Sequence, residues 1–160
     1  MTIAAPEFVA RVARAQSAMA AAGLGALLLS TEADLRYFTG FLTRFWESPT
    51  RPWYLVVPAK GDPIAVIPSI GAALMGKTWI RDIRTWVSPD LNDDGVSLLI
   101  ATLQEVGGDI GMPFGLESHA RMPLAALAQV QAAVTMRSDQ GIVAGLRAVK
   151  SADEIAKITK

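Results

Sequence analysis

Short apolar runs alternate along the chain with stretches that carry the three- and four-residue spacing of amphipathic helices. The runs of strand length fall at 26–29, 53–57, 64–67, 80–86, 109–117 (with a kink at Pro113) and 134–136. Such runs, bounded by glycine, proline or other turn residues, predict strands. The segment from Pro58 to Pro63 joins the second and third strands as a hairpin. Because helices and strands otherwise alternate, the sequence predicts an α/β layered domain with a mixed central sheet flanked by helices.

Capping residues and glycines mark the expected helix boundaries. Pro6 opens an amphipathic helix that ends near Gly23. Thr31 is expected to cap a short helix through Leu35, after which the chain enters an irregular loop. The remaining helices are expected over 69–77, from a cap at Asp94 to 106, from Pro123, and from Asp139.

The composition argues against several classes of function. The 160 residues hold 15 basic and 15 acidic side chains, without the basic excess of a nucleic-acid-binding protein. Basic and aromatic residues interleave over 78–86, but a half-exposed strand accounts for this better than a base-stacking surface. No apolar run reaches the roughly 18 residues that predict a membrane helix. The absence of cysteine excludes disulfides and fits a cytoplasmic protein.

Residues that could carry catalysis are scarce. His119 is the only histidine, whereas catalytic zinc takes three protein ligands, most often including histidines. We interpret His119 as a surface residue that flanks the helix at Pro123, in preference to a general base beside Glu117. Neither a nucleophile elbow nor a phosphate-binding loop occurs. The sequence predicts no catalytic residue, no metal ligand and no cofactor site in this chain.

The loop from Leu42 to Pro52 is the best candidate for a binding surface. It combines two arginines and two large aromatic residues, namely Arg44, Phe45, Trp46 and Arg51. Loops on a rigid frame often carry binding residues, and tryptophan and arginine are favoured at interfaces. We therefore expect these four residues to bind substrate or form an interface. In the alternative, the aromatic residues fold back on their own domain and the arginines are solvated.

The last residues indicate a helix that has only begun. Ser151 followed by Glu154 has the spacing of a capping box, and Asp153 adds negative charge to the first turn. Only Ile155 and Ile158 have entered the apolar stripe when the sequence ends. We therefore expect residues 1–146 to form one domain and residues 147–160 to be a junction into a further domain.

Several segments, in order and spacing, together resemble the N-terminal domain of the creatinase / aminopeptidase P (Xaa-Pro aminopeptidase) / prolidase family. The most telling segments are Arg36-Tyr37-Phe38-Thr39-Gly40-Phe41 and Arg147-Ala148-Val149-Lys150-Ser151-Ala152-Asp153-Glu154-Ile155, and Gly115-Leu116-Glu117 lies between them. The resemblance covers nearly the whole chain. It implies a ribonuclease-H-like α/β fold that is not itself catalytic.

The resemblance also implies partners outside this sequence. In the family, a "pita-bread" catalytic domain follows the junction and holds a pair of divalent metal ions, for which we expect Mn, Co or Zn. Members are commonly homodimers or larger, and in several the loop after the Thr-Gly-Phe element reaches the active site of a neighbouring subunit. Arg44, Phe45, Trp46 and Arg51 occupy that loop here.

Three interpretations of function stay open at this point. The resemblance favours a non-catalytic domain of a metal-dependent hydrolase, most simply an Xaa-Pro aminopeptidase or dipeptidase, that serves oligomerisation and substrate-pocket shaping. A relative of the same fold could instead cleave a non-peptide small molecule, as creatinase-like or ectoine-hydrolase-like enzymes do. The third is a self-standing α/β binding module that ends at Lys160.

Overall fold

A single mixed sheet forms the centre of the molecule. The computed structural model describes residues 5–48 and 50–159. Within these residues, a 6-stranded sheet has the order β4-β3-β2-β1-β5-β6. The strands are β1 (Ala26–Leu29), β2 (Tyr54–Pro58), β3 (Ile64–Pro68), β4 (Asp82–Trp86), β5 (Ile110–Met112) and β6 (Met136–Ser138). The α/β fold with a mixed central sheet, predicted from the alternating pattern, is confirmed.

Strand β1 organises the pairing. It runs antiparallel to β2, with Leu28 opposite Val56, and parallel to β5, with Leu27 opposite Gly111. The hairpin partners β2 and β3 are antiparallel, while β4 and β6 add parallel strands at the two edges. All the side chains of β1 are buried, as expected for a strand covered on both faces.

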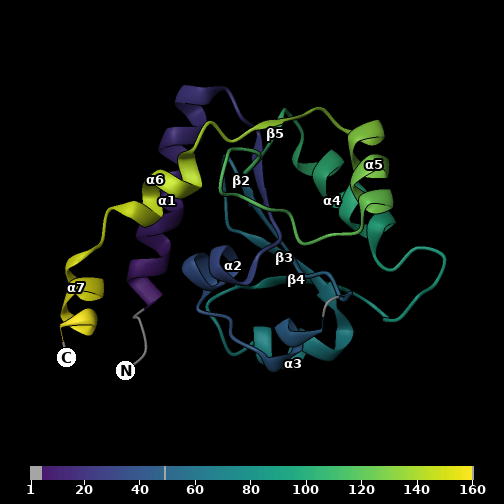
Figure 1. Ribbon diagram of the computed structural model, residues 1–160, viewed down its shortest axis with the longest axis horizontal. Coiled ribbons are helices and arrows are strands. Elements are labelled where there is room, and N and C mark those ends of the chain that lie inside the picture. Colours follow the sequence, from purple (N-terminus) through teal and green to yellow (C-terminus); the bar gives the residue numbers. More distant parts are fainter. Residues whose placement is uncertain (1–4, 49, 160) are drawn as a thin grey trace.

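Helices cover both faces of the sheet (Figure 1). They are α1 (Ala5–Ala22), α2 (Glu32–Thr39), α3 (Ala72–Met75), α4 (Val96–Val106), α5 (Leu124–Ala133), α6 (Ile142–Ala148) and α7 (Ala152–Ile158), with 3₁₀ helices η1 (Arg44–Glu47) and η2 (Ser69–Gly71). One apolar cluster packs α1, α2 and α6 against the sheet through residues such as Met19, Phe38 and Val143. The other packs α4 and α5 through Leu99 and Val130.

The Arg-Tyr-x-Thr-Gly-Phe element has a structural role. Thr31 caps α2 as predicted, but the helix continues past Leu35 to Thr39. The Thr39 hydroxyl donates to the Leu35 carbonyl and accepts from the Phe41 amide (2.6 and 2.9 Å). Gly40 ends the helix with φ 76°, a left-handed conformation that favours glycine. The element therefore turns the chain sharply into the loop that follows.

Three expectations were wrong in detail. Gly115–Glu117 is not in a strand: β5 ends at Met112, and these residues lie in an exposed loop where Glu117 has φ 61°. Asp93, not Asp94, accepts the amide of Ser97 in the first turn of α4. Asp94 turns inward instead and accepts from Trp86 and Ser88. The last strand, β6, lies over 136–138, later than expected.

Candidate functional site

The loop between α2 and β2 carries the predicted binding residues. Thr43 caps η1 by accepting from the Phe45 amide (3.3 Å). The amides of Trp46 and Ser48 are bonded to the carbonyls of Thr43 and Phe45 (3.4 and 3.2 Å). This single helical turn gives successive side chains different directions, so neighbouring residues of the loop differ in how far their side chains are buried. Pro49 lies outside the described residues.

Trp53 forms the floor beneath the loop. It is fully buried, and the rings of Phe41, Phe45 and Trp46 pack against it at centroid distances of 5.6, 6.1 and 5.9 Å. Gly71 in η2 makes room for it, because a Cβ there would lie 2.2 Å from the Trp53 ring. The loop thus rests on an aromatic cluster continuous with the core.

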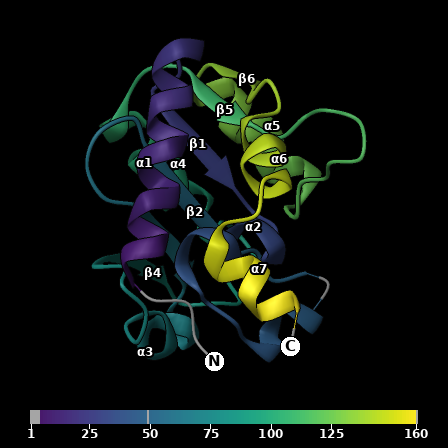
Figure 2. The same cartoon turned by 90° about the vertical axis from the view of Figure 1, so that its left-hand side faces the viewer.

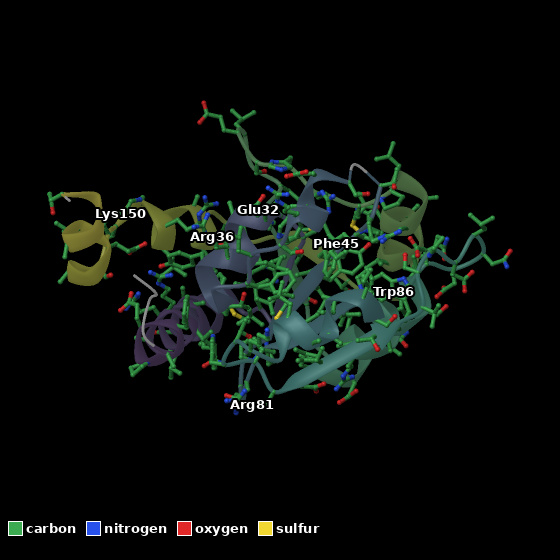
Figure 3. All side chains as sticks on the ribbon, turned by 90° about the horizontal axis from the view of Figure 1, so that it is seen from below. Glu32, Arg36, Phe45, Arg81, Trp86 and Lys150 are labelled. Atoms are coloured by element: carbon green, nitrogen blue, oxygen red, sulfur yellow. The ribbon has the colours of Figure 1, made fainter. Side chains whose placement is uncertain are left out.

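The four predicted residues differ in how far their side chains are buried. Trp46 is 9% exposed and Arg51 is half-buried, whereas Phe45 is 37% exposed and Arg44 lies on the surface. Phe45 and Lys150, which precedes α7, lie well apart, so the loop and the C-terminal segment are distinct surfaces (Figure 3). Trp46 folds back on its own domain, while Arg44, Phe45 and Arg51 retain surface that a ligand or partner can reach.

Arg121 joins this loop to a distant part of the chain. Its guanidinium donates to the carbonyls of Trp46 (3.3 Å), Ser48 and Arg51 (2.6 Å). The same group lies 5.0 Å from the centroid of the Trp46 ring, within the range of a cation–π interaction. Burial lowers the pKa of Arg121, opposed by the field of Glu32. No sequence signal marks Arg121, because its partners lie about seventy residues earlier and the spacing follows no motif.

A cavity of about 390 Å³ lies between the two segments that Arg121 connects. Its lining consists of Thr50, Arg51 and Pro52 on one side and Ala120, Arg121, Met122 and Pro123 on the other. Arg44 lines a different hollow, together with Glu32 and Glu47. The wall of the cavity is largely apolar and includes two arginines, of which Arg121 already donates to the loop carbonyls.

A second polar cluster holds the C-terminal segment. Arg11 on α1 is 1% exposed; it donates to the Tyr37 carbonyl at 2.6 Å and lies 3.3 Å from a Glu154 carboxylate oxygen. The Tyr37 hydroxyl donates to the Leu146 carbonyl at 3.0 Å. Asp34 pairs with Arg147 at 2.7 Å. These contacts place α7 near the first turns of α1 (Figure 2).

The predicted capping box is present at the start of α7. The Ser151 hydroxyl accepts from the Glu154 amide (3.3 Å), and the Glu154 carboxylate accepts from the Ser151 amide (2.9 Å). Glu154 therefore serves two functions, since its other oxygen faces Arg11.

The described residues show no donor set for metal chemistry. Within 5–48 and 50–159, no three His, Cys, Asp or Glu side chains are grouped so that they could hold a metal ion. His119 is exposed in the loop before α5, on the rim of a cavity that Asp34 and Arg147 also line. The metal pair that the resemblance implies does not fit the residues of this part of the chain. No helix in the same residues is long and apolar enough to cross a membrane.

The fold and the loop define the class of this protein: an α/β domain whose mixed sheet supports an aromatic, arginine-bearing loop. The chain belongs to the creatinase/prolidase N-terminal domain family, whose profile matches residues 11–149.

Solved structures share this fold. The crystal structure of dipeptidase PepE from Mycobacterium ulcerans is similar with a TM-score of 0.75 and 26% identity, over 98% of this chain and 40% of that one. A recombinant prolidase from Thermococcus sibiricus has a TM-score of 0.75 and 15% identity, over 98% and 40%. The creatinase/prolidase N-terminal domain of an X-Pro dipeptidase from Streptococcus pyogenes has 0.67 and 16%, over 85% and 98%.

The chain spans 40% of the length of the Mycobacterium and Thermococcus proteins, but 98% of the isolated Streptococcus domain is covered. At identities below 25%, the likeness to the last two concerns the fold alone. No curated protein sequence matches the chain at a significant level.

Proposed function

We propose that this chain is the non-catalytic N-terminal domain of a metal-dependent hydrolase, an Xaa-Pro aminopeptidase or dipeptidase, in which it serves oligomerisation and shapes the substrate pocket. The family membership and the dipeptidase and prolidase neighbours support this proposal. The single observation that carries the pocket role is the loop after α2, which is fixed to the sheet yet exposes Arg44, Phe45 and part of Arg51.

The rest of the enzyme follows from the same proposal. Residues 1–146 form the domain and 147–160 the junction, so that α7 leads into the catalytic domain. That domain holds the divalent metal pair, Mn, Co or Zn, which lowers the pKa of bound water for attack on a carbonyl. The enzyme is a cytoplasmic homodimer that binds neither nucleic acid nor membrane, and the loop of one subunit faces the pocket of the other.

The exposed loop residues would bind substrate and take no part in the chemical step. An arginine can pair with a substrate carboxylate, and an aromatic ring can exclude water from a pocket. Removing either should weaken ground-state and transition-state binding together, which raises KM and leaves kcat nearly unchanged. The buried Trp46 is a poor probe of this role, because its loss would disturb the loop as a whole.

The test uses the longer protein encoded by the gene. Its activity is screened with Mn, Co and Zn against Xaa-Pro peptides, creatine and an ectoine-like compound. Arg51→Ala and Phe45→Ala are then compared with Arg36→Ala, a change of an exposed side chain on α2. We expect KM to rise about tenfold for the first two and to stay constant for the control. Hydrolysis of the non-peptide compounds alone would instead identify a creatinase-like or ectoine-hydrolase-like enzyme.

Other outcomes separate the remaining alternatives. Unchanged kinetic constants in both loop variants would remove the pocket-shaping role. A gene without a catalytic domain after residue 160 would favour the self-standing binding module. Metal-dependent peptide cleavage by the 160-residue chain alone would overturn the proposal that this domain is non-catalytic.

A further inference from the structure

We propose that Arg121 is the positioning residue of the loop: its guanidinium latches Trp46, Ser48 and Arg51 to the sheet and thereby fixes the exposed side chain of Phe45 and the half-buried side chain of Arg51. The latch itself is a claim about this domain. Only its consequence for substrate rests on the proposed function.

The shape of the guanidinium fits this task. It is planar, and its donors reach carbonyls of Trp46, Ser48 and Arg51, which span the loop. Its face covers the Trp46 ring at 5.0 Å. Lysine could not replace it, because an ammonium offers donors from a single atom and cannot bond along several edges of a plane. One side chain therefore fixes both the backbone of the loop and its buried aromatic anchor.

The charge of Arg121 is committed to the loop. Among the described residues, no carboxylate lies within 4.0 Å of its guanidinium, so carbonyl dipoles are its partners. Hydrogen bonds from a charged donor are stronger than those between neutral groups. A carboxylate in contact would compete for the same donors, whereas Glu32 acts on Arg121 only through its field and leaves the donors to the loop.

The other end of the latch is attached to the centre of the sheet. The Arg121 amide donates to the Ser30 hydroxyl at 3.0 Å, and Ser30 directly follows the central strand β1. Ser30 is 2% exposed, so this bond is shielded from water. Arg121 therefore fixes the position of the loop relative to β1, in addition to the chain connections of the loop to α2 and β2.

Hydrogen exchange of the 160-residue chain tests the latch. In Arg121→Lys, the amides of Trp46 and Ser48 should exchange about tenfold faster or more, since a hydrogen bond to a charged group contributes at least that factor. Amides of β1 and β2 should keep their protection. Arg36→Lys is the matched control, because Arg36 is exposed on α2, and it should change neither set. Ser30→Ala should loosen the same loop amides by a smaller factor.

A chemical reporter adds an independent reading. In the fluorine NMR spectrum of protein labelled with 5-fluorotryptophan, the Trp46 resonance should shift and broaden in Arg121→Lys. Its loss in Trp46→Phe identifies this resonance. The other three tryptophan signals should move less. We expect only arginine at position 121 to give the native Trp46 resonance.

Each outcome decides the proposal. Unchanged exchange of the loop in Arg121→Lys overturns it, and so does loss of protection throughout the sheet, because a latch releases only what it holds. If the loop is released but KM of the longer enzyme stays constant, the latch stands and the pocket role of the loop fails. If KM rises about tenfold with kcat unchanged, both stand.

Discussion

Two segments lie outside the sheet core, and each is held by an arginine, but the two attachments differ in kind. Arg121 bonds to backbone carbonyls of the loop at 44–51, and the loop buries Trp46 against Trp53. Arg11 instead faces a side-chain carboxylate of α7, whose exposed Ile155 contributes little to the core. Because backbone latching plus aromatic burial couples a segment to the core, the loop should unfold with the domain, whereas α7 should open by itself.

The largest effect is expected from removal of the aromatic anchor of the loop. Trp46→Ala should lower the free energy of unfolding by about 3 kcal/mol, because a large buried ring is lost from a packed cluster. Urea denaturation followed by circular dichroism measures the change.

The matched control for this variant is Trp46→Phe. The buried indole nitrogen of Trp46 has no hydrogen-bond partner within the described residues, so phenylalanine loses packing but no hydrogen bond. We expect a cost below about 1.5 kcal/mol. If Trp46→Ala lowers the free energy of unfolding no more than Trp46→Phe does, the loop is not coupled to the core and does not differ from α7 in this respect.

The next largest effect concerns the arginine that holds the other segment. Arg11→Met should cost about 2 kcal/mol, because the Tyr37 carbonyl loses its donor and the methionine cannot replace the charge that faces Glu7 and Glu154. Glu7 and Glu154 remain partly exposed and can rehydrate, which limits the cost. In addition, α7 amides should exchange faster than in the native chain.

Arg14→Met provides the control on the same helix. Arg14 is 47% exposed, and its ion pair in the described part of the chain is with Glu7, at 3.5 Å. A surface pair of this kind contributes about 0–1 kcal/mol, so the variant should be nearly neutral. Equal destabilisation by the two variants would mean that loss of helix α1 surface charge, and not the buried contacts of Arg11, explains the effect.

The sequence predicted features that depend on local physics. The caps at Thr31 and Ser151 and the apolar run of β1 follow from neighbouring residues, and all three are confirmed. The strand expected over 109–117 is present only as β5, because Leu116 and Glu117 lie in a loop that buries neither side chain. Periodicity cannot indicate whether a partner strand is available.

The site was only half accessible to the same reasoning. The composition of the loop identified Arg44, Phe45, Trp46 and Arg51, but not which of them faces the core, since that depends on the turn of η1 and on Trp53 below it. Arg121 and Arg11 could not be found at all. Each acts on partners far away in sequence, 70 residues in one case and 26 in the other, through backbone carbonyls that carry no sequence signal.

A smaller effect is expected from the cap of α7. Ser151→Ala removes the acceptor of the Glu154 amide and should destabilise α7 locally by about 1 kcal/mol. The midpoint of global unfolding should stay constant, because α7 is proposed to open before the domain unfolds. Ser17→Ala on the exposed side of α1 is the control. A shift of the global midpoint would contradict the independence of α7 and bring the two segments closer in kind.

The smallest expected effect isolates the charge between Arg11 and α7. In Glu154→Gln the amide oxygen can still accept from the Ser151 amide, so the cap survives while the charge facing Arg11 is lost. One terminal nitrogen of the Arg11 guanidinium lies 3.3 Å from a Glu154 carboxylate oxygen. This nitrogen has no hydrogen-bond partner in the described residues, so the contact is an ion pair without a hydrogen bond. A double-mutant cycle with Arg11→Met should therefore give a coupling of only about 0.5 kcal/mol.

The salt dependence of this coupling distinguishes the attachment of α7 from that of the loop. Glu154 is 18% exposed whereas Arg11 is buried, so the coupling should fall between about 0.05 and 0.5 M NaCl as the screening length shortens, but by less than for a fully exposed pair. The carbonyl bonds of Arg121 lie at contact distance and should keep the loop amides protected over the same range. If both segments respond to salt alike, the carbonyl latch and the ion pair are not different devices. If only α7 responds, the domain holds one segment as part of its core and the other by a contact that the solution can loosen.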